Sequence, residues 1–358
     1  MPTRMLIAGP NLTIDRTARL DELRPGEVLR FERVVVTPGG KGLNVARAAR
    51  ALGVEALLVG FVPGETGRAG AGLIAREGIA LRGVPCGGEL RSTAVVMERD
   101  GRTTVLNEPG PEITAAEWEA YEAAIAAEIA EHGVLVCSGS VPPGSPDDAY
   151  ARLAAIAAEA GRRCVVDAAG VTLVRALAAG VDVVCPNVAE AEEALAALAA
   201  ARGGDAGAAG AVAADDERVA AAGGGAGVAA AAGDRVAAAR SAAPVTTAVD
   251  ARARAEGAAA ALVGRGARAA LVTADAAGAA LAMAGEAFVW LPAPHIERVQ
   301  NPVGAGDVLA SALAAALERG EPLPEAARRG VAAAAASVES PKAGELDPAR
   351  AAELLGAL

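Results

Sequence analysis

The length, composition and charge of the chain limit the kinds of protein that it can be. Its 358 residues carry a formal net charge of -11, and only 2% of them are aromatic. A charge of this sign argues against nucleic acid or an anionic membrane surface as a partner. Residues 1–10 lack the pattern of a secretory signal peptide, and no window is long and apolar enough to span a bilayer, so we expect a cytoplasmic enzyme.

Short apolar runs alternate with helical stretches along most of the chain. The runs have the continuous apolar character of strands buried on both faces, and they lie at residues 5–8, 56–59, 134–137, 164–167, 181–185 and 269–273. Such alternation predicts a mostly parallel sheet that helices cover on both sides. We therefore expect an α/β fold, with residues 1–358 forming a single domain.

Two regions depart from this alternation. Residues 30–36 and a predicted hairpin of 93–97 with 103–106 have no helices beside them, which indicates a small β-sheet lid built from about 12–37 and 90–107. The Ala/Gly-rich segment at about 202–248 buries too little apolar surface to offset its ordering entropy. We interpret it as a flexible or loosely helical insertion with a passive role.

Polar and glycine-rich motifs follow the first predicted strands. Asn11 and Asp15 lie just past a strand end, where α/β proteins usually hold ligands, although both residues are also favoured in turns. Gly39-Gly40-Lys41-Gly42 then begins a helix, so the backbone can approach an anion that the lysine neutralises. The alternative is a glycine-rich turn with a solvated lysine. The spacing does not fit a Walker A loop.

Two further helix starts carry acidic residues. Asn187 and Glu190 are three positions apart at a strand end, so their oxygens could share one Mg²⁺; a helix N-cap with an acidic first turn is the alternative. Gly304, Ala305 and Gly306 precede Asp307 and an Ala/Leu-rich run, which predicts an anion-binding helix N-terminus beside a carboxylate. Asp307 is then a candidate general base, or only a favourable acidic residue in a first helical turn.

Together these motifs predict phosphoryl transfer between two anionic molecules. The stretch from Gly39 to Arg47 resembles the first signature of the PfkB carbohydrate kinases, and Val303 to Asp307 resembles the second. The resemblance covers nearly the whole chain except about 202–260, and the residues at 107–112 look most like the 1-phosphofructokinase branch. It implies a ribokinase-like three-layer α/β/α fold with a β lid that often contributes to a homodimer, and it implies the use of ATP and Mg²⁺.

The resemblance also assigns roles to individual residues. Asp307 would take the proton of a sugar hydroxyl, and the amides of Gly304, Ala305 and Gly306 would form the anion hole. Lys41 and Arg91 would hold the phosphate already present on the substrate. The substrate-binding residues that it implies are Asn11, Asp15, Gly39, Gly40, Lys41, Asn44, Arg91 and Ser140. On the nucleotide side it implies Asn187, Thr273, Gly278, Gly304 and Gly306, with Asn187 and Glu190 at the metal.

The sequence departs from the family pattern on the nucleotide side. Cys185 stands where a lysine is usual, and Ala274 follows Thr273 where leucine is usual. We expect a kinase that converts D-fructose 1-phosphate to the 1,6-bisphosphate. The alternatives are tagatose 6-phosphate or fructose 6-phosphate as the substrate, and a sugar-phosphate-binding regulator that has lost turnover.

Overall fold

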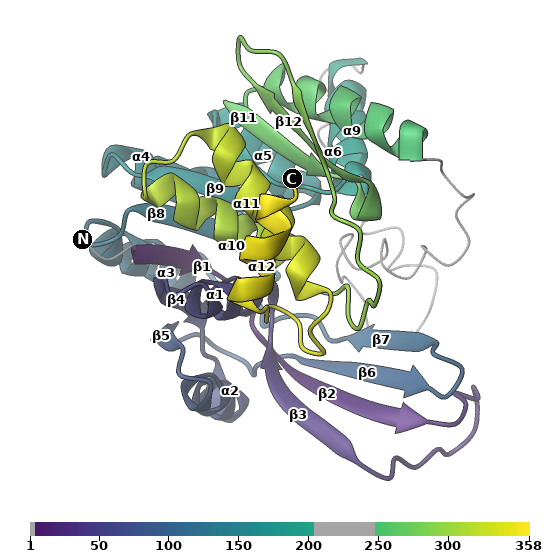
Figure 1. The fold of residues 1–358 in the computed structure, drawn as a ribbon. Coiled ribbons are helices and arrows are strands. Elements are labelled where there is room, and N and C mark those ends of the chain that lie inside the picture. Colours follow the sequence, from purple (N-terminus) through teal and green to yellow (C-terminus); the bar gives the residue numbers. More distant parts are fainter. Residues whose placement is uncertain (1–3, 204–247) are drawn as a thin grey trace.

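A nine-stranded sheet forms the centre of the protein, whose structure is a computed structural model that describes residues 4–203 and 248–358. The strand order is β13-β12-β11-β10-β9-β8-β1-β4-β5 (Figure 1). Neighbours from β11 to β5 run parallel, whereas β12 and β13 are antiparallel additions at one edge. The strands are β1 (Arg4–Ala8), β4 (Glu55–Phe61), β5 (Ala80–Val84), β8 (Val134–Ser138), β9 (Arg163–Asp167), β10 (Val183–Val184), β11 (Ala269–Thr273), β12 (Gly278–Met283) and β13 (Val289–Pro292).

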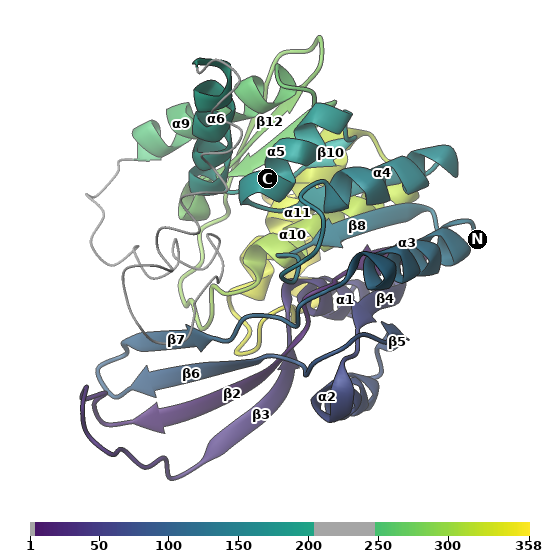
Figure 2. The ribbon, with the colours of Figure 1, turned by 180° about the vertical axis from the view of Figure 1, so that it is seen from behind.

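Helices cover both faces of this sheet, as Figures 1 and 2 show from opposite sides. One face carries α3 (Ala115–Ile129), α4 (Ala149–Glu159), α5 (Gly170–Ala179), α6 (Val188–Gly203) and α9 (Ala248–Val263). The other face carries α1 (Lys41–Ala51), α2 (Gly64–Arg76), α10 (Ala305–Glu318) and α11 (Leu323–Ser337), with α12 (Pro348–Gly356) packed outside α1 and α11. The predicted three-layer arrangement is therefore confirmed.

The apolar strands are explained by burial on both faces. In β1, Leu6 and Ala8 pack against one helical layer, and Met5 and Ile7 pack against the other. All of these side chains are fully buried. Each large one contributes about 1.5–3 kcal/mol on burial, so a polar residue on either face of β1 would be strongly destabilising. This is why the strand reads as a continuous apolar run and shows no alternation.

The second sheet is the predicted lid, and it projects from the main body as a separate arm (Figure 1). Its strands are β2 (Thr13–Leu20), β3 (Val34–Gly39), β6 (Ser92–Glu98) and β7 (Thr103–Asn107), in the order β3-β2-β6-β7. The predicted strand at 30–36 was wrong at both ends, because pairing with β2 begins at Val34 and continues through Pro38 and Gly39. An edge strand tolerates that proline, since the missing N–H costs no ladder hydrogen bond there.

Other boundaries also differ from expectation. The strand β5 was not predicted, because its sequence mixes charged, small and apolar residues. The strand β10 is limited to Val183–Val184, shorter than the expected 181–185. The Ala/Gly-rich insertion at about 202–248 lies almost entirely outside the described residues. Within residues 4–203 and 248–358, no helix combines the length and hydrophobicity needed to cross a membrane.

Candidate active site

The predicted helix N-terminus at 304–307 is confirmed as the start of α10. Its N-cap, Gly304, adopts a left-handed conformation with φ 84°, which a glycine tolerates far better than other residues. A Cβ at this position would also lie 3.1 Å from the Gly344 nitrogen and 3.4 Å from Asn44 Nδ2. The Ala305 N–H donates to the Pro302 carbonyl at 3.4 Å. The following first-turn N–H groups, beginning with Gly306, have no acceptors within the helix, and the positive end of the helix dipole lies here. This end of α10 can therefore bind an anion.

Asp307 lies in the first turn of α10 and is buried, with only 3% of its surface exposed. Its Oδ2 accepts a 2.9 Å hydrogen bond from Asn44 Nδ2, while its Oδ1 has no hydrogen-bond partner among the described residues. Burial raises the pKa of Asp307 to about 7; the nearby Asp167 and Glu190 carboxylates act in the same direction, and Lys41 and the Asn44 hydrogen bond oppose them. A carboxylate with such a pKa can both accept and release a proton near neutrality.

Lys41 begins α1 and lies between two buried carboxylates. Its Nζ is 3.7 Å from Asp167 Oδ2 and 3.8 Å from Glu190 Oε1. The stem of the lysine passes over Gly139, where a Cβ would come within 3.1 Å of Lys41 Cβ. Asp167 was not among the predicted site residues, although its place at the carboxyl end of the buried strand β9 is the signal that could have identified it.

The Asp15 carboxylate lies against Gly39, its diagonal neighbour on the adjacent strand at the base of the lid. A Cβ on Gly39 would lie 2.2 Å from Asp15 Oδ2, so only glycine leaves room for this carboxylate. Burial raises the pKa of Asp15, against the opposing effects of Arg47, Arg91 and a hydrogen bond from Thr93. Asp15 therefore lies within the electrostatic reach of two guanidinium groups.

Asn11 and Arg91 complete the polar edge beside the lid. Arg91 donates from its guanidinium to the main-chain carbonyls of Asn11 and Leu12, at 3.2 and 3.4 Å. Asn11 donates from Nδ2 to Ser140 Oγ at 3.0 Å, and its Oδ1 is buried without a hydrogen-bond partner in the described part of the chain. An unpaired buried acceptor of this kind is suited to a ligand hydroxyl.

Asn187 and Glu190 form a reciprocal cap at the start of α6. The Glu190 amide donates to Asn187 Oδ1 at 3.0 Å, and the Asn187 amide donates to Glu190 Oε2 at 2.9 Å. The helix-cap alternative is thus realised, while Glu190 Oε1 still faces Lys41. The described residues contain no cluster of three or more His, Cys, Asp or Glu side chains that could hold a metal ion alone.

Thr273 and Gly278 lie at the same edge of the sheet as Asn187. Thr273 ends β11 and pairs with Asn187 in an isolated parallel bridge. Gly278 has φ 134°, and a Cβ there would lie 2.2 Å from the Leu291 carbonyl oxygen. The packing of β12 against β13 by itself explains why position 278 is a glycine. The presence of glycine there is therefore no evidence for the predicted role of this residue in nucleotide binding.

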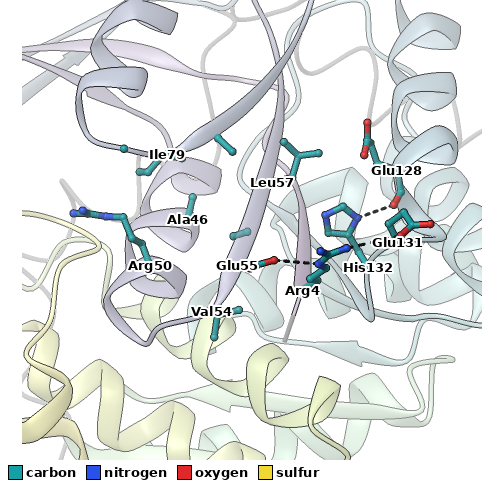
Figure 3. A pocket seen from close by; sticks show the side chains of 13 residues that line it. Arg4, Ala46, Arg50, Val54, Glu55, Leu57, Ile79, Glu128, Glu131 and His132 are labelled. Atoms are coloured by element: carbon teal, nitrogen blue, oxygen red, sulfur yellow. Dashed lines mark hydrogen bonds and ion pairs between the residues drawn. The ribbon is translucent and has the colours of Figure 1, made fainter. Parts of the chain in front are cut away.

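A cavity of about 620 Å³ lies elsewhere, beside the amino ends of β1, β4 and β5 (Figure 3). Arg4 and Glu55, which line it, form a 3.0 Å ion pair, and His132 Nδ1 lies 2.7 Å from the Glu128 carbonyl oxygen. None of the predicted site residues lines this cavity. The predicted residues instead gather at the carboxyl ends of the strands, which is the usual ligand edge of a parallel sheet.

Comparison with known proteins identifies the family to which the chain is similar. The pattern of pfkB family carbohydrate kinases matches residues 9–252 and 246–350. A 1-phosphofructokinase from Xanthomonas campestris pv. campestris is 35% identical over 172 residues, which are 47% of this chain and 54% of that protein. The chain thus spans about half the length of that relative.

Solved structures resemble the chain over its whole length. A mutant phosphofructokinase-2 from Escherichia coli matches with a TM-score of 0.77 at 23% identity, covering 99% of both chains. An Arabidopsis thaliana ribokinase complexed with ribose and ATP matches with a TM-score of 0.69 at 19% identity, again covering 99% of each. These likenesses show a ribokinase-like fold. With the match along the sequence, they establish that the chain belongs to the pfkB family of carbohydrate kinases.

Proposed function

We propose that this protein is an ATP-dependent kinase of a ketohexose monophosphate, with D-fructose 1-phosphate as the substrate and D-fructose 1,6-bisphosphate as the product. The 1-phosphofructokinase relative from Xanthomonas supports this choice of sugar. The choice also follows from the cations near the site, because Lys41 and Arg91 suit a substrate that already carries a phosphate.

One observation carries the proposal. Asp307 is buried in the first turn of α10, and one of its oxygens is held by Asn44 while the other has no partner within the described chain. A merely structural acidic residue in a first helical turn would be stabilised by its contacts or by solvent. A buried carboxylate with an unused oxygen and a pKa raised to about 7 is instead suited to accept a proton from a bound hydroxyl.

The reaction that this geometry supports is a direct transfer. The proton of the attacking sugar hydroxyl moves to Asp307 Oδ1, and the hydroxyl oxygen bonds to the γ-phosphorus of ATP. The bond from that phosphorus to the β–γ bridging oxygen then breaks, and ADP leaves. The N–H groups at the start of α10, near Gly304 and Gly306, would stabilise the charge on the transferred phosphoryl oxygens.

The residues at the base of the lid would bind the sugar. Asp15 and Asn11 Oδ1 can accept hydrogen bonds from sugar hydroxyls, and Ser140 lies beside Asn11. Gly39 and Gly40 would let the backbone approach the sugar. Asn44 Nδ2 has two hydrogens, so a second donor remains after the bond to Asp307. Arg91 would hold the substrate phosphate, and the contacts of Lys41 with Asp167 and Glu190 favour an additional place for Lys41 beside the transferred phosphoryl group.

The nucleotide would bind at the ends of β10, β11 and β12, near Asn187, Thr273 and Gly278. The carboxylates of Asp167 and Glu190 are buried, and each has one oxygen at ion-pair distance from Lys41 Nζ. Two such neighbouring carboxylates suit a Mg²⁺ held mainly by nucleotide phosphates, since this ion usually takes one or two carboxylates. Asn187 and Glu190 remain the predicted protein ligands of the Mg²⁺, and we propose Asp167 as a further one. A bound Mg²⁺ would neutralise charge on the β- and γ-phosphates. Cys185 is buried, so it does not replace the missing lysine.

The lid supplies the proposed contact with a second copy of this chain. Val35 and Val105 are 45% and 51% exposed, although each lies within a strand of the lid. Exposed β-branched residues on a four-stranded sheet suit packing against another sheet. We propose a homodimer in which two lids face each other.

The test is release of ADP from Mg-ATP with fructose 1-phosphate, tagatose 6-phosphate, fructose 6-phosphate and ribose in parallel, for the wild type and Asp307→Asn. Rapid turnover of fructose 1-phosphate that the variant lacks would support the proposal. Preference for another phosphosugar would mean that the proposed substrate is wrong, while the proposed role of Asp307 as the base would stand. Turnover of ribose alone would overturn the phosphate-binding roles, and binding of a phosphosugar without any turnover would establish the regulator alternative.

A further inference from the structure

Arg47 is a buried arginine on α1, with only 3% of its surface exposed, and every N–H of its guanidinium has an acceptor. Nε and one Nη donate to the two oxygens of Glu77, at 2.7 and 2.9 Å. The same Nη donates to the Pro38 carbonyl at 2.7 Å. The other Nη donates to Asn44 Oδ1 at 2.9 Å and more weakly to the Ala343 carbonyl at 3.4 Å.

These acceptors come from segments that surround the candidate active site. Pro38 lies in the lid strand β3, Glu77 follows α2, and Ala343 belongs to the loop before α12. The partner of interest is Asn44, one turn away on the same helix, because its amide also contacts Asp307. A guanidinium has donors only, so it can hold the amide by its oxygen but not by its nitrogen. With Oδ1 turned toward Arg47, Nδ2 must turn toward Asp307.

We propose that Arg47 is a positioning residue that fixes the orientation of the Asn44 amide, so that Asn44 donates to Asp307 Oδ2 and leaves Oδ1 as the oxygen that receives the proton. The proposal rests on the function proposed above for Asp307. Without Arg47 the amide loses the partner of its oxygen and can rotate. In a fraction of the molecules, Asp307 Oδ2 would then lose the hydrogen bond from Asn44 Nδ2 or would face the Asn44 oxygen.

A purely structural role for Arg47 is the competing explanation, because its contacts also join the lid strand to α2 and the loop before α12. Two effects separate the explanations. A structural role changes thermal stability and the amount of folded protein. A positioning role also shifts the proton affinity of Asp307, because the hydrogen bond from Asn44 favours the charged carboxylate.

The first experiment compares Arg47→Met and Arg47→Lys with the control Arg50→Met, an exposed arginine on the same helix. Lysine keeps the positive charge beside Glu77. Its single ammonium group cannot bind both Glu77 oxygens, as the planar guanidinium does, and also reach Asn44. We expect both Arg47 variants to lower kcat about tenfold or more and to move the acid limb of kcat upward by about one pH unit, with the control unchanged. An unmoved acid limb in Arg47→Lys would overturn the proposal, even if Arg47→Met does not fold.

A double-mutant cycle tests whether Arg47 acts through Asn44. In an Asn44→Ala background, Arg47→Lys should cause no further shift of the acid limb, because the amide that it positions is gone. A shift of the same size in both backgrounds would contradict the inference. Such additivity would mean that Arg47 affects Asp307 by a route that does not include the Asn44 amide.

A second readout needs no turnover, so it separates failure of this inference from failure of the proposed function. Carboxyl carbon-13 NMR of aspartate-labelled protein, with the Asp307 signal assigned by its loss in Asp307→Asn, reports the titration of Asp307 directly. The midpoint should rise by about one pH unit in Arg47→Lys and stay unchanged in Arg50→Met. An unchanged midpoint in Arg47→Lys would reject the positioning role whatever the substrate proves to be.

Discussion

Asn44 and Asp307 are 263 positions apart in the chain, yet Asn44 Nδ2 lies 2.9 Å from Asp307 Oδ2. The pairing of α1 with α10 on one face of the sheet brings them together, and Ser311 on α10 strengthens the helix contact by donating to the Val45 carbonyl at 3.0 Å. A Cβ on Gly304, the N-cap of α10, would lie 3.4 Å from Asn44 Nδ2, so the start of α10 lies close to the first turns of α1. The carboxylate that we propose as the base, and its donor, are thus held in place by helix packing and not by a loop.

The first prediction concerns pH. Because the base must be ionised before it accepts a proton, kcat should rise with pH through the pKa of Asp307, which burial raises to about 7. Below that value kcat should fall about tenfold for each pH unit. The measurement is kcat with saturating substrates from about pH 5.5 to pH 9. An acid limb near the ordinary aspartate pKa would contradict the role of burial, and the residual rate of Asp307→Asn should lack the limb.

The sequence allowed the helix starts of the site to be predicted because glycines and polar caps are local signals. Gly304 and the Gly39-Gly40 pair mark the starts of α10 and α1, as observed. The Asn187–Glu190 pair shows the limit of such signals. The same spacing suits a metal pair and a reciprocal cap, and only the fold shows that the cap is formed.

Contacts between distant segments could not be predicted from local patterns. Nothing near Arg47 in the sequence indicates that its partners include Glu77 and Ala343. Asp167 was recognisable only as a polar residue after a buried strand, and its proximity to Lys41 depends on the order of strands β8 and β9 in the sheet. Pairing with β2 likewise set the start of β3 at Val34.

The second prediction uses the crowding at Gly39. A Cβ there would lie 2.2 Å from Asp15 Oδ2, so Gly39→Ala should displace the Asp15 carboxylate. The expected result is an increase of about tenfold or more in the KM for the sugar phosphate, with little change in the KM for ATP. Steady-state kinetics of both substrates measure this. The control is Gly72→Ala on α2, where the nearest atom to a Cβ is 3.9 Å away. Equal effects of the two substitutions would contradict the role of Asp15.

The third prediction concerns stability. The folded state raises the pKa of Asp307 from 3.8 to about 7, so it binds a proton that the unfolded chain releases between these values. Stability should therefore fall as pH rises through this window and stay at the lower level above it. Asp307→Asn removes the effect and should be more stable than the wild type at pH 8, by roughly 2–4 kcal/mol at most.

Denaturant unfolding at about pH 4 and about pH 8 measures that difference. The stability advantage of Asp307→Asn over the wild type should grow as the pH rises. A constant difference between Asp307→Asn and the wild type would mean that Asp307 does not titrate in this range. That result would also remove the explanation offered for the acid limb of kcat.

The fourth prediction concerns the lid. Pairing aligns Val35, Thr17, Val95 and Val105 in one row across the sheet, on the face that also carries Asp15. A second lid packed on this face would cover Asp15 and the proposed sugar site, which is why we expect the dimer contact here. Val105→Lys should therefore shift the protein toward monomers in analytical ultracentrifugation and raise the KM for the sugar phosphate.

Val36→Lys is the matched control, because Val36 is exposed to a similar degree, 41% against 51% for Val105, but lies on the opposite face of the lid. It should leave both the mass and the KM unchanged. Dissociation by Val36→Lys alone would place the contact on the other face, where a partner would not cover Asp15. A monomeric wild type would contradict the proposed dimer and, with it, the expected effect of Val105→Lys on the KM.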